Sequence, residues 1–372
     1  MNRPKVSDVV GIINKFAPFS SAEEWDNAGL QVGDPKALAD RIMVSLDPGR
    51  DAIEAAIAHG CRLLLTHHPL IFKPLKRISV GEPVGELISL AIRNNLAVIS
   101  LHTNLDIAAG GVNDMLAELL GVTSPVPLKV INQEELVKLA VFVPQGSEEQ
   151  VLEALFRFSG IIGNYADCSF SSPGTGTFRP QEGAHPTIGV VGSRESVQEN
   201  RVEVLIRKDD LAAALNALFK AHPYEEPAFD LYPLLNCGKV TGMGRIGLLA
   251  EETTLALFAA VVKERLALPW VRFVGDAGMP VRKVALCGGS GASLVREASR
   301  QGADLLVTGD VKYHEAREAE MLGLAILDAG HFATEMPMVR GVAGIMRIEL
   351  EKRRFDADVV EFGGEREPFS HI

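Results

Sequence analysis

The sequence has only four cysteines, and they are far apart. Cys61, Cys168, Cys237 and Cys287 form no C-x-x-C pair, so neither a thiolate zinc site nor a disulfide framework is indicated. Isolated cysteines fit a reducing compartment, and we therefore expect the protein in the cytoplasm.

Long apolar runs are also missing. No stretch approaches the roughly 18 apolar residues that a membrane-spanning helix requires, so we expect no membrane partner. The opening stretch, MNRPKVSDVVGIINKFAPFS, has charged residues within its apolar part. It predicts an amphipathic helix rather than a signal peptide.

The sequence has no excess of basic residues. The formal net charge is −11, from 37 Lys and Arg against 48 Asp and Glu, which disfavours a surface for nucleic acid. Hydrophobic residues make up 47% and charged residues 23% of the 372 residues. This composition is typical of a folded globular protein, and the length predicts two or three domains.

Short β-branched runs alternate with helical periodicity in the first and last thirds of the chain. Such alternation predicts βαβ units and a mainly parallel sheet flanked by helices, which is an α/β fold. The expected strands are 42–46, 63–66, 97–101, 283–287, 304–308, 323–327 and 358–362. The expected helices are 50–59, 84–94, 292–301, 313–321 and 335–351.

The middle of the chain has a different pattern. Longer alternating runs at 136–143 and 201–206 precede a helix at 211–221, and the stretch SSPGTGTFRPQEGAHP predicts a loop or hairpin. This pattern indicates a small α+β domain, residues 126–242, inserted into a discontinuous core formed by residues 1–125 and 243–372.

Three apolar segments of the core end directly in side chains that can bind metals. They are LLLTHHPL (63–70), AVISLHTNLD (97–106) and LAILDAGHFATE (324–335). In parallel sheets, ligands bind beyond the carboxyl ends of the strands, where several loops meet. The three segment ends therefore predict one metal site. Its candidate ligands are His67, His68, Asp106, His331 and Glu335.

The number and spacing of these donors favour two divalent ions. His331 and Glu335 are four residues apart at the start of a helix, so they share one helix face. Five nitrogen and oxygen donors exceed the three protein ligands of a typical catalytic zinc, and either Glu335 or Asp106 could bridge two ions. Imidazole and carboxylate ligands suit zinc, iron or manganese, and the sequence leaves the choice open.

His102 is the candidate catalytic residue. It precedes Asp106 in the second segment, where it could act as a general base, orient a ligand or be an ordinary buried histidine.

Several other polar positions carry two interpretations each. Asp26, in WDNAGLQVG (25–33), could line the cleft or fix a turn. CGGSG (287–291) could hold an anion on backbone N–H groups, but a tight turn is favoured. Asp47 and Asp310 follow strands and could support the metal ligands, although helix capping is the commoner role.

The segments THHPL, HTNLD and GHFATE, together with WDNAGLQVG and VALCGGSG, resemble the NIF-three-like family, often labelled GTP cyclohydrolase 1 type 2 homologs. The resemblance covers both parts of the core and implies a dinuclear centre at the five candidate ligands. Within the insert, HPYEEPAFDLYPL (222–234) resembles CutA and the PII-like, ferredoxin-type domains. The resemblance implies a homohexamer. We expect His222 and Glu225 to be structural rather than part of a second metal site.

Two functions follow from this interpretation. The first is a metal-dependent hydrolase of a small molecule. The resemblance implies a guanine nucleotide opened at C8, and a phosphoester suits the same metal pair. The second is a non-enzymatic metal-binding or regulatory hexameric scaffold.

Overall fold

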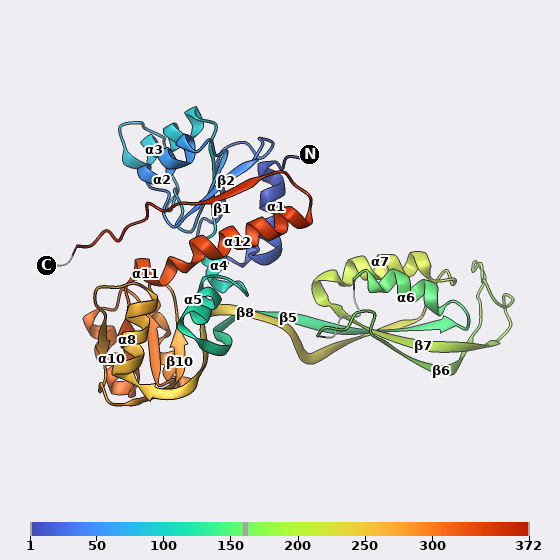
Figure 1. The fold of residues 1–372 in the computed structure, drawn as a ribbon. Helices are drawn as coiled ribbons and strands as arrows, with labels where there is room; N and C mark the ends of the chain where they lie inside the picture. Colours follow the sequence, from blue (N-terminus) through green and yellow to red (C-terminus); the bar gives the residue numbers. More distant parts are fainter. Residues whose placement is uncertain (1, 159–162, 371–372) are drawn as a thin grey trace. The chain divides into compact units, whose positions relative to one another are not determined.

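The structure, a computed structural model, describes residues 2–158 and 163–370. The chain forms two compact units. The first contains residues 1–132 and 241–372, and the second contains residues 133–240. The boundaries expected at 125 and 242 lie within strands β5 (Val122–Pro144) and β8 (Phe229–Thr254), each of which continues from one unit into the other (Figure 1). Among the described residues, no helix is long and apolar enough to cross a membrane.

The first unit begins with a five-stranded sheet in the order β1-β4-β3-β2-β13. All neighbouring strands are parallel except β1, which is antiparallel to β4. The strands are β1 (Gly29–Val32), β2 (Arg41–Ser45), β3 (Leu63–Thr66), β4 (Ala97–Ser100) and β13 (Asp358–Glu361). The helices of this part are α1 (Val6–Phe16), α2 (Arg50–Ala58), α3 (Pro83–Arg93), α4 (Thr103–Ile107), α5 (Val112–Leu120) and α12 (Pro337–Lys352).

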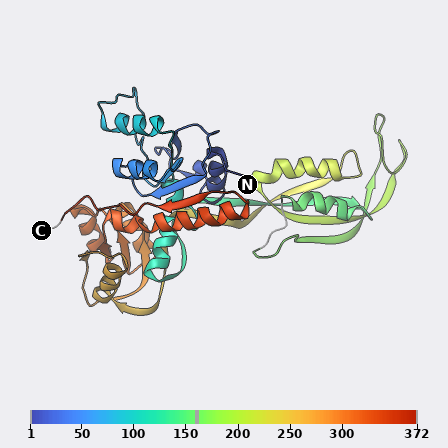
Figure 2. The same cartoon turned by 45° about the horizontal axis from the view of Figure 1, so that its top comes forward.

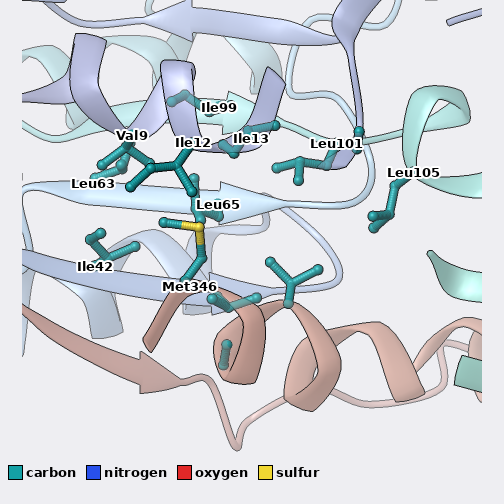
Figure 3. Packing of buried hydrophobic residues seen from close by; sticks show 14 of the residues in the cluster. Val9, Ile12, Ile13, Ile42, Leu63, Leu65, Ile99, Leu101, Leu105 and Met346 are labelled. Atoms are coloured by element: carbon teal, nitrogen blue, oxygen red, sulfur yellow. The ribbon is translucent and has the colours of Figure 1, made fainter. Parts of the chain in front are cut away.

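Both faces of this sheet are covered, which explains why the central strands β3 and β4 are buried at every position and mostly apolar. On one face, Ile12 of α1 and Met346 of α12 pack against Leu65 of β3 (Figure 3). On the other face, Leu64 packs with Ile53 of α2 and other buried side chains. Helix α12 lies along the first sheet in both ribbon views (Figures 1 and 2). Each fully buried aliphatic side chain contributes about 1.5–3 kcal/mol to stability.

The second part of this unit is built around strands β10, β11 and β12, which are parallel to one another. β8 and β9 pair with the two edges of this group in antiparallel orientation. The strands are β9 (Arg272–Val274), β10 (Pro280–Leu286), β11 (Leu305–Thr308) and β12 (Ala325–Asp328). The helices are α8 (Leu255–Arg265), α9 (Val295–Arg300), α10 (Tyr313–Leu322) and α11 (His331–Glu335).

The second unit has the element order βαββαβ, which is the ferredoxin-like arrangement predicted for the insert. Its strands run in the order β6-β7-β5-β8. Besides β5 and β8 it contains α6 (Glu148–Phe156), β6 (Ser169–Phe178), β7 (Glu195–Arg207) and α7 (Leu211–Ala221). β6 and β7 are antiparallel, so the Gly- and Pro-rich stretch contributes one strand and the loop of a hairpin.

The HPYEEP segment of this unit is held by hydrogen bonds. His222 donates from Nε2 to the Phe142 carbonyl (3.0 Å), and its Nδ1 accepts from the Tyr224 amide (3.1 Å). The Glu225 carboxylate accepts from the His185 amide at 2.9 Å. Both ring nitrogens of His222 are engaged, which fits the structural role expected for it.

The α/β fold class predicted from the sequence is confirmed by this architecture. Strands β3 and β4 end at Thr66 and Ser100, and β12 ends at Asp328. The candidate ligands follow these ends within a few residues, so the topology determines where they lie.

Candidate metal centre

His67 and His68 follow β3, and their side chains differ in burial. His67 is fully buried, whereas the side chain of His68 is 24% exposed. The ring Nδ1 of His67 donates to the Leu101 carbonyl at 2.8 Å, so its Nε2 keeps a free lone pair. That atom is buried and has no hydrogen-bond partner among the described residues.

Three further imidazoles are oriented by carboxylates in the same way. The Nδ1 atom of each ring lies 2.7 Å from an aspartate oxygen: His68 from Asp47, His331 from Asp310 and His102 from Asp26. Metal-binding histidines typically donate from one nitrogen to a carboxylate or carbonyl and bind through the other. These contacts leave Nε2 of every ring available.

The free nitrogens gather around the buried carboxylate of Glu335. Nε2 of His68 and Nε2 of His331 both lie 3.1 Å from Glu335 Oε2, and Nε2 of His67 lies 3.5 Å from Oε1. Oε2 nevertheless has no well-aligned hydrogen bond within the described part of the chain. Asp106 Oδ1 lies 3.7 Å from His67 Nε2 and is likewise buried without a partner.

The structure thus brings all five predicted ligands together. Two sets of three side chains could each hold an ion: His67, His68 and His102, and His68, His331 and Glu335. His68 belongs to both sets, and Asp106 contacts His67 beside the first.

The charges of the cluster are strongly coupled. Burial raises the pKa of Glu335, but the neighbouring imidazoles of His67, His331 and His68 outweigh this effect and hold the pKa well below its usual range. Burial lowers the pKa of His68, yet the hydrogen bond to Asp47 and the close Glu335 carboxylate raise it to about 10. For His331, the close Glu335 carboxylate is the main cause of a pKa of about 9. The site is therefore built to hold positive charge against buried carboxylates.

The family model of Duf34/NIF3 (NGG1p interacting factor 3) matches residues 4–368. This chain belongs to the DUF34/NIF3 family. It is 42% identical over 365 residues to the GTP cyclohydrolase 1 type 2 homolog of Halalkalibacterium halodurans, with 98% of each chain covered. It is 41% identical over 365 residues to the protein of the same name from Bacillus subtilis, again with 98% of each covered.

Solved structures agree with this assignment. The crystal structure of a Bacillus cereus protein related to NIF3 matches with a TM-score of 0.90 and 39% identity, and each chain is covered completely. A Staphylococcus aureus protein matches with a TM-score of 0.82, 30% identity and complete coverage of both chains. The family and the fold predicted from the sequence are both confirmed.

Three acidic residues of this NIF3-family chain have roles that the sequence left open. Asp47 and Asp310 orient imidazoles, and neither is the N-cap of the following helix, so the capping role favoured from the sequence is wrong. Asp26 bonds His102 and also accepts from the Thr103 amide and hydroxyl. Burial raises the pKa of Asp26, but the bonds from His102 and Thr103 outweigh it and bring the pKa to about 2.

The CGGSG segment lies next to Glu335. Its three glycine amides are already used, since Gly288 donates to Asn113, Gly289 to Thr334 and Gly291 to Thr308. A tight turn, rather than an anion site, is therefore its role.

Two aromatic side chains near His102 were not singled out from the sequence. Trp25 is 60% exposed and Phe72 is 48% exposed, and their ring centroids lie 5.9 Å apart. Both rings approach His102, at 5.9 and 6.2 Å between centroids. Exposed aromatic residues in loops are ordinary in sequence, so only the position of these two beside His102 gives them significance.

Proposed function

We propose that this protein binds two divalent metal ions through His67, His68, Asp106, His331 and Glu335, and that it is a metal-dependent hydrolase. The supporting observation is that His67 Nε2, Asp106 Oδ1 and Glu335 Oε2 are buried near one another without hydrogen-bond partners among the described residues. Buried polar atoms are normally paired, and each orphan requires an explanation. A bound cation satisfies all of them at once.

The spacing of the donors supports this proposal. Ligand bonds of about 2.0–2.1 Å in tetrahedral geometry place neighbouring donors roughly 3.3 Å apart. Among His68, His331 and Glu335, the corresponding distances are 3.1, 3.1 and 3.4 Å. Glu335 contacts all three histidines, so its carboxylate would be a ligand shared by the site. The ligand types suit zinc, iron or manganese.

A bound metal pair would supply Lewis acidity that activates water and neutralises charge developing on the substrate. His102 would move the proton. Asp26 stays ionised and holds Nδ1 of His102, so that Nε2 can take a proton from water and return it to the leaving atom.

The substrate that we propose is a nucleotide with a purine base. The relatives named GTP cyclohydrolase 1 type 2 homolog support this class, and Trp25 and Phe72 offer rings for stacking beside His102. In the reaction, water would add to C8 of guanine and the bond from C8 to N9 would break, with His102 delivering the proton to N9. A phosphoester is the other hydrolase substrate that the same ligands suit. The homohexameric assembly and the cytoplasmic location stay predictions.

Metal-reconstituted protein incubated with GTP, other nucleotides and phosphoesters tests the hydrolase. Turnover is expected in the unmodified protein and should fall to background in His67→Ala and Glu335→Ala. Glu264→Gln, an exposed carboxylate on α8, is the matched control and should retain full activity. Equal background in all four samples would refute the hydrolase and favour a metal-binding scaffold. Full metal content in Glu335→Ala would refute the ligand set.

A further inference from the structure

The second unit contains a cavity of about 790 Å³ that is separate from the metal centre. The β6–β7 loop forms one side of it, and the HPYEEP segment forms another. Hydrogen bonds tie these two parts together, from the His185 amide to Glu225 (2.9 Å) and from the Thr187 hydroxyl to the Pro223 carbonyl (2.7 Å). The cavity is therefore a half-open pocket between two connected segments, and its volume is that of a typical small-molecule site.

A buried carboxylate lies in its wall. Glu199 of β7 is 8% exposed, and it forms no ion pair within the described ranges. Gly176 on the paired strand leaves space for it, because a Cβ at that position would lie 2.0 Å from Glu199 Oε2. Burying a carboxylate without a cation is unfavourable, so this group needs a positively charged partner.

A second polar group lies beside Glu199. The Tyr224 hydroxyl is buried in the same cavity wall next to the Glu199 carboxylate, although the two form no well-aligned hydrogen bond. Burial, together with the charge of Glu199, raises the pKa of Tyr224 to about 12, so the phenol stays protonated. Its oxygen can accept a hydrogen bond from a ligand.

The remaining wall favours an organic cation. The rings of Phe178 and Tyr224 lie 5.9 Å apart at 60°, which offers aromatic surface to a cationic head. Among the described lining residues, Glu182, Glu225 and Glu226 add negative charge, whereas Arg179 is the one basic side chain. This distribution disfavours phosphates and carboxylates as ligands.

We propose that this cavity binds a small organic cation with an alkylguanidinium or alkylammonium head, which pairs with Glu199, donates to the Tyr224 hydroxyl and packs against Phe178. Guanidinium suits the site because it pairs with a carboxylate through two parallel hydrogen bonds and stacks on aromatic rings.

Calorimetric titration of the full-length, metal-reconstituted protein tests the site. The probes are n-butylguanidinium, n-butylammonium and N-butylurea, the last being a neutral molecule of the same shape as the first. Both cations should bind, and the urea should bind about tenfold more weakly or not at all. Glu199→Gln should weaken the cations about tenfold or more, and Tyr224→Phe should weaken them less.

The matched control is Glu149→Gln, an exposed carboxylate on α6, which should bind like the unmodified protein. Circular dichroism and thermal unfolding of each variant check that the second unit is folded. Cations that bind no tighter than the urea, or that bind Glu199→Gln unchanged, would overturn the proposal. Sedimentation compares the molecular mass of the assembly in Glu199→Gln with that in the unmodified protein. A lower mass in the variant would also overturn the proposal, because it would mean that a side chain of a second copy pairs with Glu199 in the cavity.

Discussion

Gly289 leaves no room for a side chain beside Glu335. A Cβ at Gly289 would lie 2.1 Å from Glu335 Oε1 and 3.2 Å from His331 Nε2. This glycine, in the left-handed region with φ +63°, therefore keeps open the space in which the ligand atoms meet.

Gly289→Ala should remove bound metal. The added methyl group would displace the Glu335 carboxylate, and we expect at least a tenfold loss of metal affinity, measured by competition with a chromophoric chelator. Gly302→Ala is the matched control: it has φ +70° but nothing within 4 Å of the added atom. Both variants should lose about 1 kcal/mol of stability from backbone strain, but Gly302→Ala should bind metal normally. Equal metal affinity in the two would contradict our account of Gly289.

Asp47→Asn and Asp310→Asn should each weaken metal binding about 10–100-fold. Each change leaves the ring of His68 or His331 in place but removes the negative oxygen that fixes its Nδ1 proton. Metal affinity is measured at constant pH, with the exposed Asp209→Asn as a control. If both variants bound metal as tightly as the unmodified protein, Asp47 and Asp310 would have no role in orienting the imidazoles for metal binding.

Removal of metal should destabilise the protein. His67 Nε2, Asp106 Oδ1 and Glu335 Oε2 would become buried and unpaired, and a ligand present at a thousand times its dissociation constant contributes about 4 kcal/mol. Scanning calorimetry should show a lower melting temperature after treatment with a chelator. His67→Ala should respond much less to the same treatment. An identical melting temperature with and without chelator would argue against bound metal.

His222 should make the protein less stable in acid. Burial is the main cause of its lowered pKa, so between the ordinary value of 6.5 and the lower folded value the unfolded state binds more protons. This contribution to stability is therefore present above pH 6.5 and is lost as the pH falls below it. Protonation of His222 would place a hydrogen on Nδ1, which would then face the amide hydrogen of Tyr224 and could no longer accept a hydrogen bond from it.

Denaturant unfolding between pH 7.5 and 5.5 measures this effect. His222→Gln should show a weaker loss of stability over that range than the unmodified protein, whereas the exposed His314→Gln should follow the unmodified protein. A steeper loss in His222→Gln would mean that the histidine is stabilised in its charged form.

The fold could be predicted because the apolar runs of the sequence mark the buried strands. The runs at 42–46, 63–66 and 97–101 became β2, β3 and β4 with shifts of one residue at most, because fully buried parallel strands are continuous apolar runs. The lengths of β5 and β8 could not be predicted. Their exposed positions mix polar residues with apolar ones such as Val130 and Leu235 and lack a strict alternation, so pairing with other strands decides where they end.

The convergence of the five candidate ligands could be predicted for the same topological reason, but the residues that orient them could not. His67 and Asp106 lie just after strands, and strand ends meet at one edge. Asp47 and Asp310 lie after strands too, but sequence cannot distinguish an aspartate that caps a helix from one that orients an imidazole 21 residues away. Whether an aspartate caps a helix or orients an imidazole depends on its rotamer and on the path of the loop, which only the structure shows.

His68 belongs to both sets of three possible donors, yet its ring offers only one free nitrogen. A single lone pair can coordinate one ion, so two ions would compete for this imidazole. Loading of the pair would then be sequential and unequal: one ion would take the imidazole, and the other would depend more on oxygen donors such as Asp106.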